Sequence, residues 1–361
     1  MIWAYETKQA LFFGRKEVTM TKRSIRQQYL DMLEGVEPDY LLQYSYGRNP
    51  YSQRDPLCFG LGPSAIRRRG DGKDIWGVTY VANREAGFAA LPEPGNFILD
   101  DITKWRDVIK APDISDIDWE QTAKKDMENM AKFGMDRTRS AVTYGVHMGY
   151  FQTLMAFMGF VEGLCAIQEE PEEVYALFDY LCSFYESVTE KCIDYYKPDI
   201  IQLTDDIAAF AMPFVSPEQY RTLIKPFQMR DAKFGNDRGL PIAMHCCGKC
   251  VMFVEDWVGF GVRYWDPPQT SNDLVGVQKK FGNRIILEGC FDILGELISE
   301  KCTEEMFKDA VRQAIDTYSK DALFVFNHWL FGDPDNELFN QRNRWMTEVV
   351  EDYGLHCYGG K

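Results

Sequence analysis

The chain has 361 residues, of which 45% are hydrophobic and 14% aromatic, and its formal net charge is −15 at pH 7. This length allows two average domains or one large α/β barrel with a sizeable core. The acidic balance argues against nucleic acid or an anionic membrane as a partner, because both need basic patches. No apolar run approaches the roughly 20 residues that span a bilayer, and the opening segment lacks the features of a signal peptide. Ten cysteines without regular spacing favour a reduced, cytoplasmic setting over a disulfide framework.

The amino-terminal third of the chain has a mixed pattern. Residues 1–37 are charged and amphipathic, and they predict a helical extension ahead of a catalytic domain at residues 38–361. A first strand is expected at residues 40–44. Residues 47–75 are rich in Gly, Pro and Arg and predict a long loop, and a strand or hairpin start is expected at residues 74–80.

From residue 141 onward, short apolar runs alternate with longer helical patterns. Ser216-Pro217-Glu218 predicts a helix start with proline at its first position, and Ser271 or Asn272 is a plausible cap of a later helix. Strands that alternate with helices indicate a parallel sheet. Seven strands and an unclear one near residue 76 come nearest to a single (β/α)8 barrel of TIM type, in which chemistry gathers where the strands end. The strands expected in this part are 141–146, 199–203, 241–245, 262–265, 285–288 and 323–327.

A histidine and a cysteine stand at the end of one expected strand, in the segment Pro241-Ile-Ala-Met-His-Cys-Cys-Gly-Lys-Cys250. A neutral imidazole and a thiolate at a strand end are ligands that zinc selects, and the chain has only four histidines. We therefore expect His245 and Cys247 to bind zinc. A third ligand at a neighbouring strand end would leave one position open for substrate, and its candidates are Glu288, Cys290 and His328.

The same segment allows other interpretations. Cys247 and Cys250 have the CxxC spacing of a redox dithiol. A closed structural zinc site could be formed by His245, Cys247, Cys250 and Cys290. A buried cysteine beside a histidine bonded to the backbone would need no metal. Cys246 is expected to point into the barrel wall, because neighbours alternate along a strand.

Further polar and aromatic residues follow the expected strands. Asp205 and Asp206 could supply a general base, hold a metal-bound histidine or clamp a cation, although a charge pair at a helix start would give the same pattern. Aromatic residues beside a metal suit a small aromatic substrate, although such residues more often belong to the core. We expect catalytic roles for Asp205, Asp206 and His328 and substrate contacts from Tyr144, His147, Trp265, Gln269, Phe291 and Trp329.

An ordered set of motifs resembles the uroporphyrinogen decarboxylase-like superfamily, most strongly between about residues 140 and 340. The resemblance implies a (β/α)8 barrel, in agreement with the strand count. The segments that carry it are Asp74-Ile-Trp-Gly-Val78, Gly159-Phe-Val-Glu-Gly163, Asp199-Ile-Ile-Gln-Leu-Thr-Asp-Asp206, Ser216-Pro-Glu218, Lys225-Pro226, Met244-His-Cys-Cys-Gly248, Asn272-Asp-Leu274 and Ile286-Leu-Glu-Gly-Cys-Phe-Asp292.

Within that superfamily, the corrinoid-dependent methyltransferases carry a His-x-Cys zinc motif, as His245 and Cys247 do. The stretch around Glu288 looks like the branch that demethylates methoxylated aromatics. The resemblance thus implies a zinc enzyme that moves a methyl group from a small methoxylated aromatic to the cobalt of a corrinoid protein, a carrier of the methylcobalamin type. The oligomeric state is open, and a homodimer is allowed.

Three alternatives remain within the resemblance. The methylcobamide:thiol methyltransferases have a further Cys near the carboxyl terminus, and residues 326–336 hold none. Tetrapyrrole decarboxylases have an arginine-rich amino-terminal motif that this chain lacks, Arg48 and Arg54 being the nearest basic residues. A non-catalytic zinc- or corrinoid-binding subunit is the third, because fold does not imply function.

Overall fold

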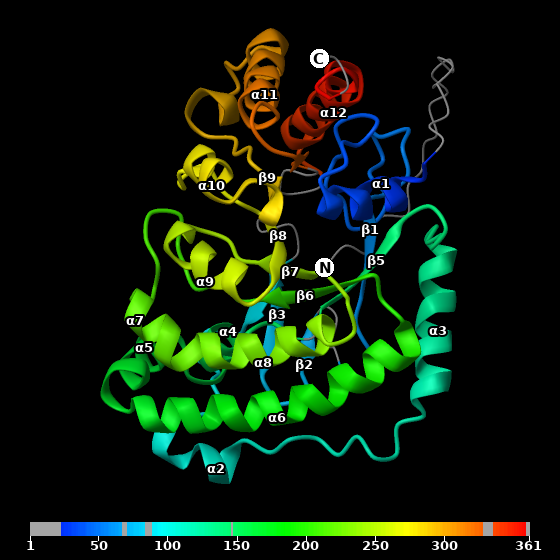
Figure 1. The fold of residues 1–361 in the computed structure, drawn as a ribbon. Helices are drawn as coiled ribbons and strands as arrows, with labels where there is room; N and C mark the ends of the chain where they lie inside the picture. The colour runs from blue at the N-terminus through cyan, green and yellow to red at the C-terminus, as the bar shows by residue number, and fades with distance from the viewer. Residues whose placement is uncertain (1–22, 67–70, 84–88, 146, 328–334, 359–361) are drawn as a thin grey trace.

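The computed structural model describes residues 23–66, 71–83, 89–145, 147–327 and 335–358 (Figure 1). At its centre is a curved sheet of seven strands in the order β1-β5-β6-β7-β8-β9-β10. All neighbouring strands in this sheet run parallel. The strands are β1 (Cys58–Leu61), β5 (Ala141–Gly145), β6 (Ile200–Thr204), β7 (Ile242–His245), β8 (Val262–Asp266), β9 (Ile286–Gly289) and β10 (Phe324–Phe326).

An irregular extended segment closes this sheet into a barrel. Gln43 forms a parallel bridge with Phe326 of β10, and Tyr46 forms one with Cys58 of β1. The Tyr44 N–H donates to the Phe326 carbonyl over 2.9 Å, and the Cys58 N–H donates to the Ser45 carbonyl over 3.1 Å. Residues 41–46 are therefore the eighth strand position, and the predicted TIM-type (β/α)8 barrel is confirmed.

The second barrel strand is not where the sequence pattern placed it. The strand or hairpin start expected at residues 74–80 is a hairpin outside the barrel: the segment leads from β2 (Gly72–Lys73) into β3 (Thr79–Asn83), and these two strands form a separate antiparallel sheet with β4 (Ala89–Pro92). The barrel strand is β1, inside the segment predicted as a long loop. With only four residues, one of them glycine, β1 gives no usable periodicity. The six strands predicted from residue 141 onward are confirmed.

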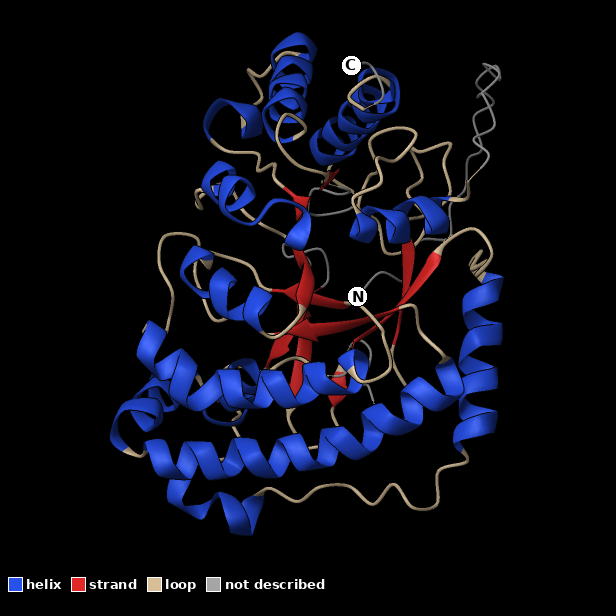
Figure 2. Ribbon diagram, viewed as in Figure 1, coloured by secondary structure: helices blue, strands red, loops and turns tan. Residues whose placement is uncertain are grey.

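Helices surround the barrel, as Figure 2 shows. Ser216 begins one of them with a capping box, and Pro217 is its first residue, as predicted. The cap predicted at Ser271 or Asn272 is wrong: Asp273 accepts the Gly276 N–H over 2.9 Å instead. The α-helices are α1 (Ile25–Asp31), α2 (Trp105–Val108), α3 (Trp119–Lys132), α4 (Tyr150–Met158), α5 (Phe160–Glu169), α6 (Pro171–Tyr196), α7 (Pro217–Gln219), α8 (Lys225–Asn236), α9 (Val254–Gly259), α10 (Leu274–Phe281), α11 (Glu304–Tyr318) and α12 (Glu337–Asp352).

Shorter helical segments join several of these elements. They are η1 (Met32–Glu34), η2 (Ile102–Lys104), the π-helical η3 (Tyr220–Ile224), η4 (Val251–Phe253), η5 (Gly282–Arg284), η6 (Gly295–Ile298) and η7 (Tyr353–Leu355). Among the described residues, no single helix is both long and apolar enough to cross a membrane. Taken together, α4 and α5 reach the required length and composition, but the two helices are bent by 116° relative to each other.

The described part of the amino-terminal segment is helical and packs on the barrel. Tyr29 of α1 is buried, and its hydroxyl donates to the Glu288 carboxylate on β9. Residues 1–22 lie outside the described residues. The predicted division into an extension at residues 1–37 and a barrel domain at residues 38–361 stays a prediction.

Candidate metal centre

Three potential metal ligands meet where β6 and β7 end. The two strands pair in register, Thr204 beside His245, so Asp206 and Cys247 each lie two residues beyond a matched position. One ligand atom from each of Asp206, His245 and Cys247 lies within 4.8 Å of the other two. Nε2 of His245 is 3.9 Å from Sγ of Cys247, where a tetrahedral zinc with ordinary bond lengths would set about 3.6 Å. Because zinc takes nitrogen, thiolate and carboxylate ligands, the three residues fit that metal.

Asp266, the last residue of β8, holds His245 from behind. Nδ1 of His245 lies 2.7 Å from Oδ2 of Asp266, whose side chain is completely buried. The carboxylate also accepts hydrogen bonds from the Tyr44 hydroxyl and, over 3.0 Å, from Nε2 of Gln202. A proton on Nδ1 leaves the Nε2 lone pair available, which is the tautomer a metal ligand needs.

The same carboxylate governs the charge of the imidazole. Burial lowers the pKa of His245, but the charge and hydrogen bond of Asp266 outweigh this effect and raise the pKa well above its ordinary value. A metal ion at this site would therefore compete with a proton for the imidazole.

The turn that follows His245 is held at every backbone amide. At Gly248, φ is +85° and a Cβ would lie 2.5 Å from the Ala208 carbonyl oxygen, so only glycine fits. Such a turn places Cys247 with little freedom to move. The amide hydrogen bonds are Cys246 to the Asp266 carbonyl (2.9 Å), Cys247 to Oδ1 of Asp206 (2.7 Å), Gly248 to Oε1 of Gln269 (2.7 Å), Lys249 to the Ala209 carbonyl (2.9 Å), and Cys250 and Val251 to Oδ1 of Asn272 (2.8 and 2.9 Å).

The other two cysteines of this turn face away from the three ligands. Cys246 and Cys250 are fully buried, and their sulfur atoms lie 3.2 Å apart. Burial raises the pKa of the Cys246 thiol well above its ordinary value. The CxxC spacing is thus misleading, because Cys250 pairs with Cys246 and does not join the described ligand group.

Two of the ligands predicted from the sequence lie elsewhere. Glu288 is 1% exposed and accepts a hydrogen bond from Tyr29; burial, and then the charge of Asp266, raise its pKa well above the ordinary value. Cys290 is also 1% exposed, and its N–H donates to the Pro268 carbonyl over 3.3 Å. Neither belongs to the described ligand group, in which Asp206 is the third member. Their roles stay predictions.

Asp205 is turned away from its neighbour, toward the first turn of α4. Its carboxylate accepts the N–H groups of Tyr150, Phe151 and Gln152, each over 3.1 Å, which satisfies amides that a helix start leaves without partners. At Gly149, φ is +97° and a Cβ would lie 2.4 Å from this carboxyl group. Burial raises the pKa of Asp205 to about 7, although the three amides oppose the shift. The contacts are those of a helix-start carboxylate.

Three residues predicted to contact substrate lie in the core. Tyr144 packs against Tyr196 of α6, with ring centroids 6.4 Å apart. Trp265 packs against Trp257 of α9, and its Nε1–H donates to the Cys246 carbonyl over 3.1 Å. Phe291 packs against Phe307 and Phe326. Substrate contact from these residues stays a prediction.

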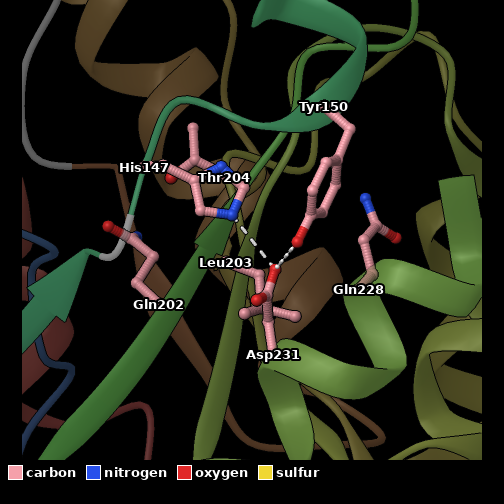
Figure 3. A pocket seen from close by; sticks show the side chains of 7 residues that line it. All are labelled: His147, Tyr150, Gln202, Leu203, Thr204, Gln228 and Asp231. Carbon is pink, nitrogen blue, oxygen red and sulfur yellow. Dashed lines mark hydrogen bonds and ion pairs between the residues drawn. The ribbon is translucent and has the colours of Figure 1, made fainter. Parts of the chain in front are cut away.

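The remaining predicted site residues are divided. Gln269 braces the turn after β7 through Gly248. His147 lines a small pocket with Tyr150 and Asp231, which Figure 3 shows from close by. His328 and Trp329 lie outside the described residues. Sequence reasoning missed three supporting residues: Asp266 holds His245, Gln152 holds Asp206, and Asn272 holds the turn after β7. Their only signal in the sequence was a position near, or facing, a strand end.

Comparisons with known proteins agree with the fold. A family model described as uroporphyrinogen decarboxylase (URO-D) matches residues 121–328, more than half of the chain. None of the curated proteins matches. The solved structure of a methyltransferase from Methanosarcina mazei is similar with a TM-score of 0.60 and 12% sequence identity, over 92% of this chain and 99% of that one. At this identity the likeness shows the fold alone.

Proposed function

The chain belongs to the uroporphyrinogen decarboxylase family, and on that premise we propose that it is a zinc-dependent methyltransferase. The proposed reaction moves the methyl group of a small methoxylated aromatic compound to the cobalt of a corrinoid carried by another protein. The observation that carries the proposal is the grouping of Asp206, His245 and Cys247 in front of Asp266. The fold shared with a protein named a methyltransferase supports it.

In this proposal the three grouped residues hold the metal and leave its fourth position open, as catalytic zinc sites do. When bound, zinc supplies a Lewis acid for the ether oxygen and makes the phenolate a better leaving group. Asp266 keeps the Nε2 lone pair of His245 directed at the site. The amide-bound turn fixes Cys247 in advance, which lowers the cost of orienting the reacting groups.

The loop after β6 suits contact with a large partner. This loop carries Asp206 and exposes Phe210, Met212 and Phe214, which are 42%, 64% and 36% exposed. Large apolar side chains gathered on a surface are typical of binding sites. Their position supports docking of the methyl-accepting protein at this end of the barrel.

The alternative of a tetrapyrrole decarboxylase needs cationic side chains for several carboxylates. Arg54 donates to the carbonyl oxygens of Leu41 and Glu351, each over 3.0 Å, and its guanidinium lies 3.9 Å from the centre of the Tyr40 ring. These contacts occupy Arg54 in the fold, so they do not favour the decarboxylase.

The test is a methyl-transfer assay on the purified protein. With cob(I)alamin and a panel of methoxylated aromatics, methylated amines and thiols, the visible spectrum reports methylcobalamin for the true donor. We expect a methoxylated aromatic to react, the protein to contain zinc, and His245→Ala to abolish both. Absence of zinc together with full activity of His245→Ala would refute the proposal. Methyl transfer from methylcobalamin to a thiol would favour the thiol methyltransferase. Carbon dioxide release from a porphyrinogen would favour the tetrapyrrole decarboxylase, and no turnover with any of these compounds would favour the non-catalytic subunit.

A further inference from the structure

A second buried histidine–carboxylate pair, His147 with Asp231, joins the loop after β5 to α8 (Figure 3); we call it the outer pair. Nε2 of His147, in the loop after β5, is 3.1 Å from Oδ2 of Asp231 on α8. The Tyr150 hydroxyl donates to the same oxygen over 2.8 Å. The two side chains of the pair are 7% and 2% exposed. Solvent therefore has little access to this group.

Both ring nitrogens of His147 are engaged. The Gly149 N–H donates to Nδ1 over 2.9 Å, so Nδ1 carries no proton and Nε2–H donates to Asp231. The ring also stacks on Tyr185 of α6, with centroids 4.2 Å apart and planes inclined by 17°. These three contacts leave the imidazole one orientation. The fixed ring in turn holds Gly149 through the hydrogen bond from the Gly149 N–H.

Gly149 leads directly to the residues that hold the metal centre. It precedes the first turn of α4, whose amides bind Asp205. In the same turn, Nε2 of Gln152 donates to Oδ2 of Asp206 over 3.0 Å. The other oxygen of Asp206 accepts the Cys247 N–H. An unbroken series of contacts thus joins Asp231 to the ligand group.

The composition of the outer pair is also unusual for simple packing. Among the described residues, Oδ1 of Asp231 is buried without a hydrogen-bond partner. A buried carboxylate oxygen in that state disfavours folding. An apolar pair at the same place would join α8 to the loop before α4 without this cost, so packing alone does not explain the residues present.

We propose that His147 and Asp231 are positioning residues of the metal centre: they fix the first turn of α4, and through Gln152 they orient the Asp206 carboxylate toward His245 and Cys247. The inference rests on the proposed zinc site. It assigns His147 to the support of a ligand and not to contact with substrate.

Two substitutions of His147 separate its bonds. The side-chain oxygen of Asn reaches about as far as Nδ1, so His147→Asn keeps the acceptor for Gly149. The amide of Gln reaches about as far as Nε2, so His147→Gln keeps the donor to Asp231 and displaces that acceptor. Tyr185→Phe is the matched control, because it keeps the stacked ring and removes only the hydroxyl that binds Trp76.

The readouts are zinc affinity, measured by competition with a chromophoric chelator, and the absorption spectrum of the Co²⁺-substituted protein. We expect His147→Gln to weaken zinc binding about tenfold, as loss of outer support for a ligand does, and to alter the Co²⁺ spectrum. His147→Asn keeps the acceptor for Gly149 but loses the donor to Asp231, so it recovers part of the affinity, and Tyr185→Phe behaves as the wild type. Thermal unfolding confirms that each variant is folded; if His147→Gln is not, Asp231→Asn replaces it.

A double-mutant cycle tests the route through Gln152. If His147 acts through that residue, adding His147→Gln to Gln152→Ala causes no further loss of zinc affinity. Losses that simply add, or an unchanged affinity and Co²⁺ spectrum in folded His147→Gln, would overturn the inference while the zinc site stands. A wild-type protein that binds no zinc would overturn the proposed function, and the inference with it.

Discussion

The described residues include two histidine–carboxylate pairs, the inner pair of His245 and Asp266 and the outer pair of His147 and Asp231. They differ in what faces the ring nitrogen that the carboxylate does not bind. His245 gives Nδ1 to Asp266 and keeps Nε2 beside Cys247, 3.9 Å from its sulfur. His147 gives Nε2 to Asp231, and its Nδ1 accepts the Gly149 N–H. The His245 side chain is 30% exposed and that of His147 is 7% exposed. The first pair can take a metal ion, whereas the second has no lone pair to offer.

This difference shows why a histidine beside a carboxylate is not by itself a metal site. What decides is whether the nitrogen that is not bonded to the carboxylate faces other ligands or a backbone donor. In the inner pair that nitrogen faces a thiol and a second carboxylate. In the outer pair that nitrogen accepts a backbone N–H, so the imidazole has a structural role.

The largest expected effect separates the two histidines directly. His245→Ala removes a ligand, and we expect zinc affinity to fall by more than about 100-fold, beyond the range for loss of an outer partner. His147→Ala leaves all three ligands in place, so its loss should be about tenfold. Chelator competition on the two purified variants checks this order. Equal losses would show that the inner and outer pairs do not differ as described.

Replacing the carboxylate of the inner pair gives the next largest effect. Asp266→Asn keeps the shape but removes the charge, and we expect zinc affinity to fall about 10- to 100-fold. The pKa of His245 should also fall in the metal-free variant, because Asp266 contributes most to raising it. Titration of the imidazole by NMR measures this change directly.

The same substitution predicts a change in pH dependence. In the metal-free protein the folded-state pKa of His245 lies above its ordinary value of 6.5, so its protonated form stabilises the fold. That contribution is complete below about pH 6.5 and is lost as the pH rises through the folded-state pKa. Asp266→Asn should flatten the decline in the free energy of unfolding over this range. An unchanged slope would assign the decline to other groups.

A glycine tests how tightly the turn before α4, which lies between the outer and inner pairs, is packed. In Gly149→Ala the new Cβ would meet the Asp205 carboxyl group at 2.4 Å, and we expect a loss of about 2–3 kcal/mol in the free energy of unfolding, from contact and backbone strain together. Gly134→Ala is the matched control, with φ +94° and nothing within 4 Å of its Cβ; it should cost about 1 kcal/mol. Denaturant unfolding measures both. Equal losses would mean that the turn before α4 tolerates a side chain.

Most of the barrel could be predicted from the sequence because each strand after residue 141 is a short apolar run between helical patterns. The exceptions have physical causes. The short strand β1 lies among glycines and prolines, and its neighbour at residues 41–46 pairs irregularly on both sides. The hairpin near Trp76 has strand-like composition but packs against α6 through the Tyr185 hydroxyl, a contact between residues far apart in the chain.

The ligand set was predictable only in part, for a similar reason. His245 and Cys247 are neighbours in the chain, so their chemistry shows in the sequence. Asp206 joins them because β6 and β7 pair in register, and no local pattern gives register. Glu288 has a suitable side chain at a strand end, but it accepts a hydrogen bond from Tyr29, 259 residues away. Which carboxylates reach the metal centre is thus decided by tertiary contacts.

The smallest expected effect is a difference in thiol reactivity between one cysteine near each pair. Cys247 is partly exposed beside His245, whereas Cys182 is buried near Asp231 and Tyr150. Burial raises the pKa of both thiols, but at Cys247 the hydrogen bond and charge of His245 oppose the shift. We expect iodoacetamide to modify Cys247 slowly in the metal-free protein and severalfold more slowly with zinc, because the thiolate that reacts is also the metal ligand. Cys182 should resist in both states, and the exposed Cys165 should react equally in both. Peptide mass spectrometry resolves the three sites, and zinc protection of Cys182 instead of Cys247 would place the metal at the outer pair.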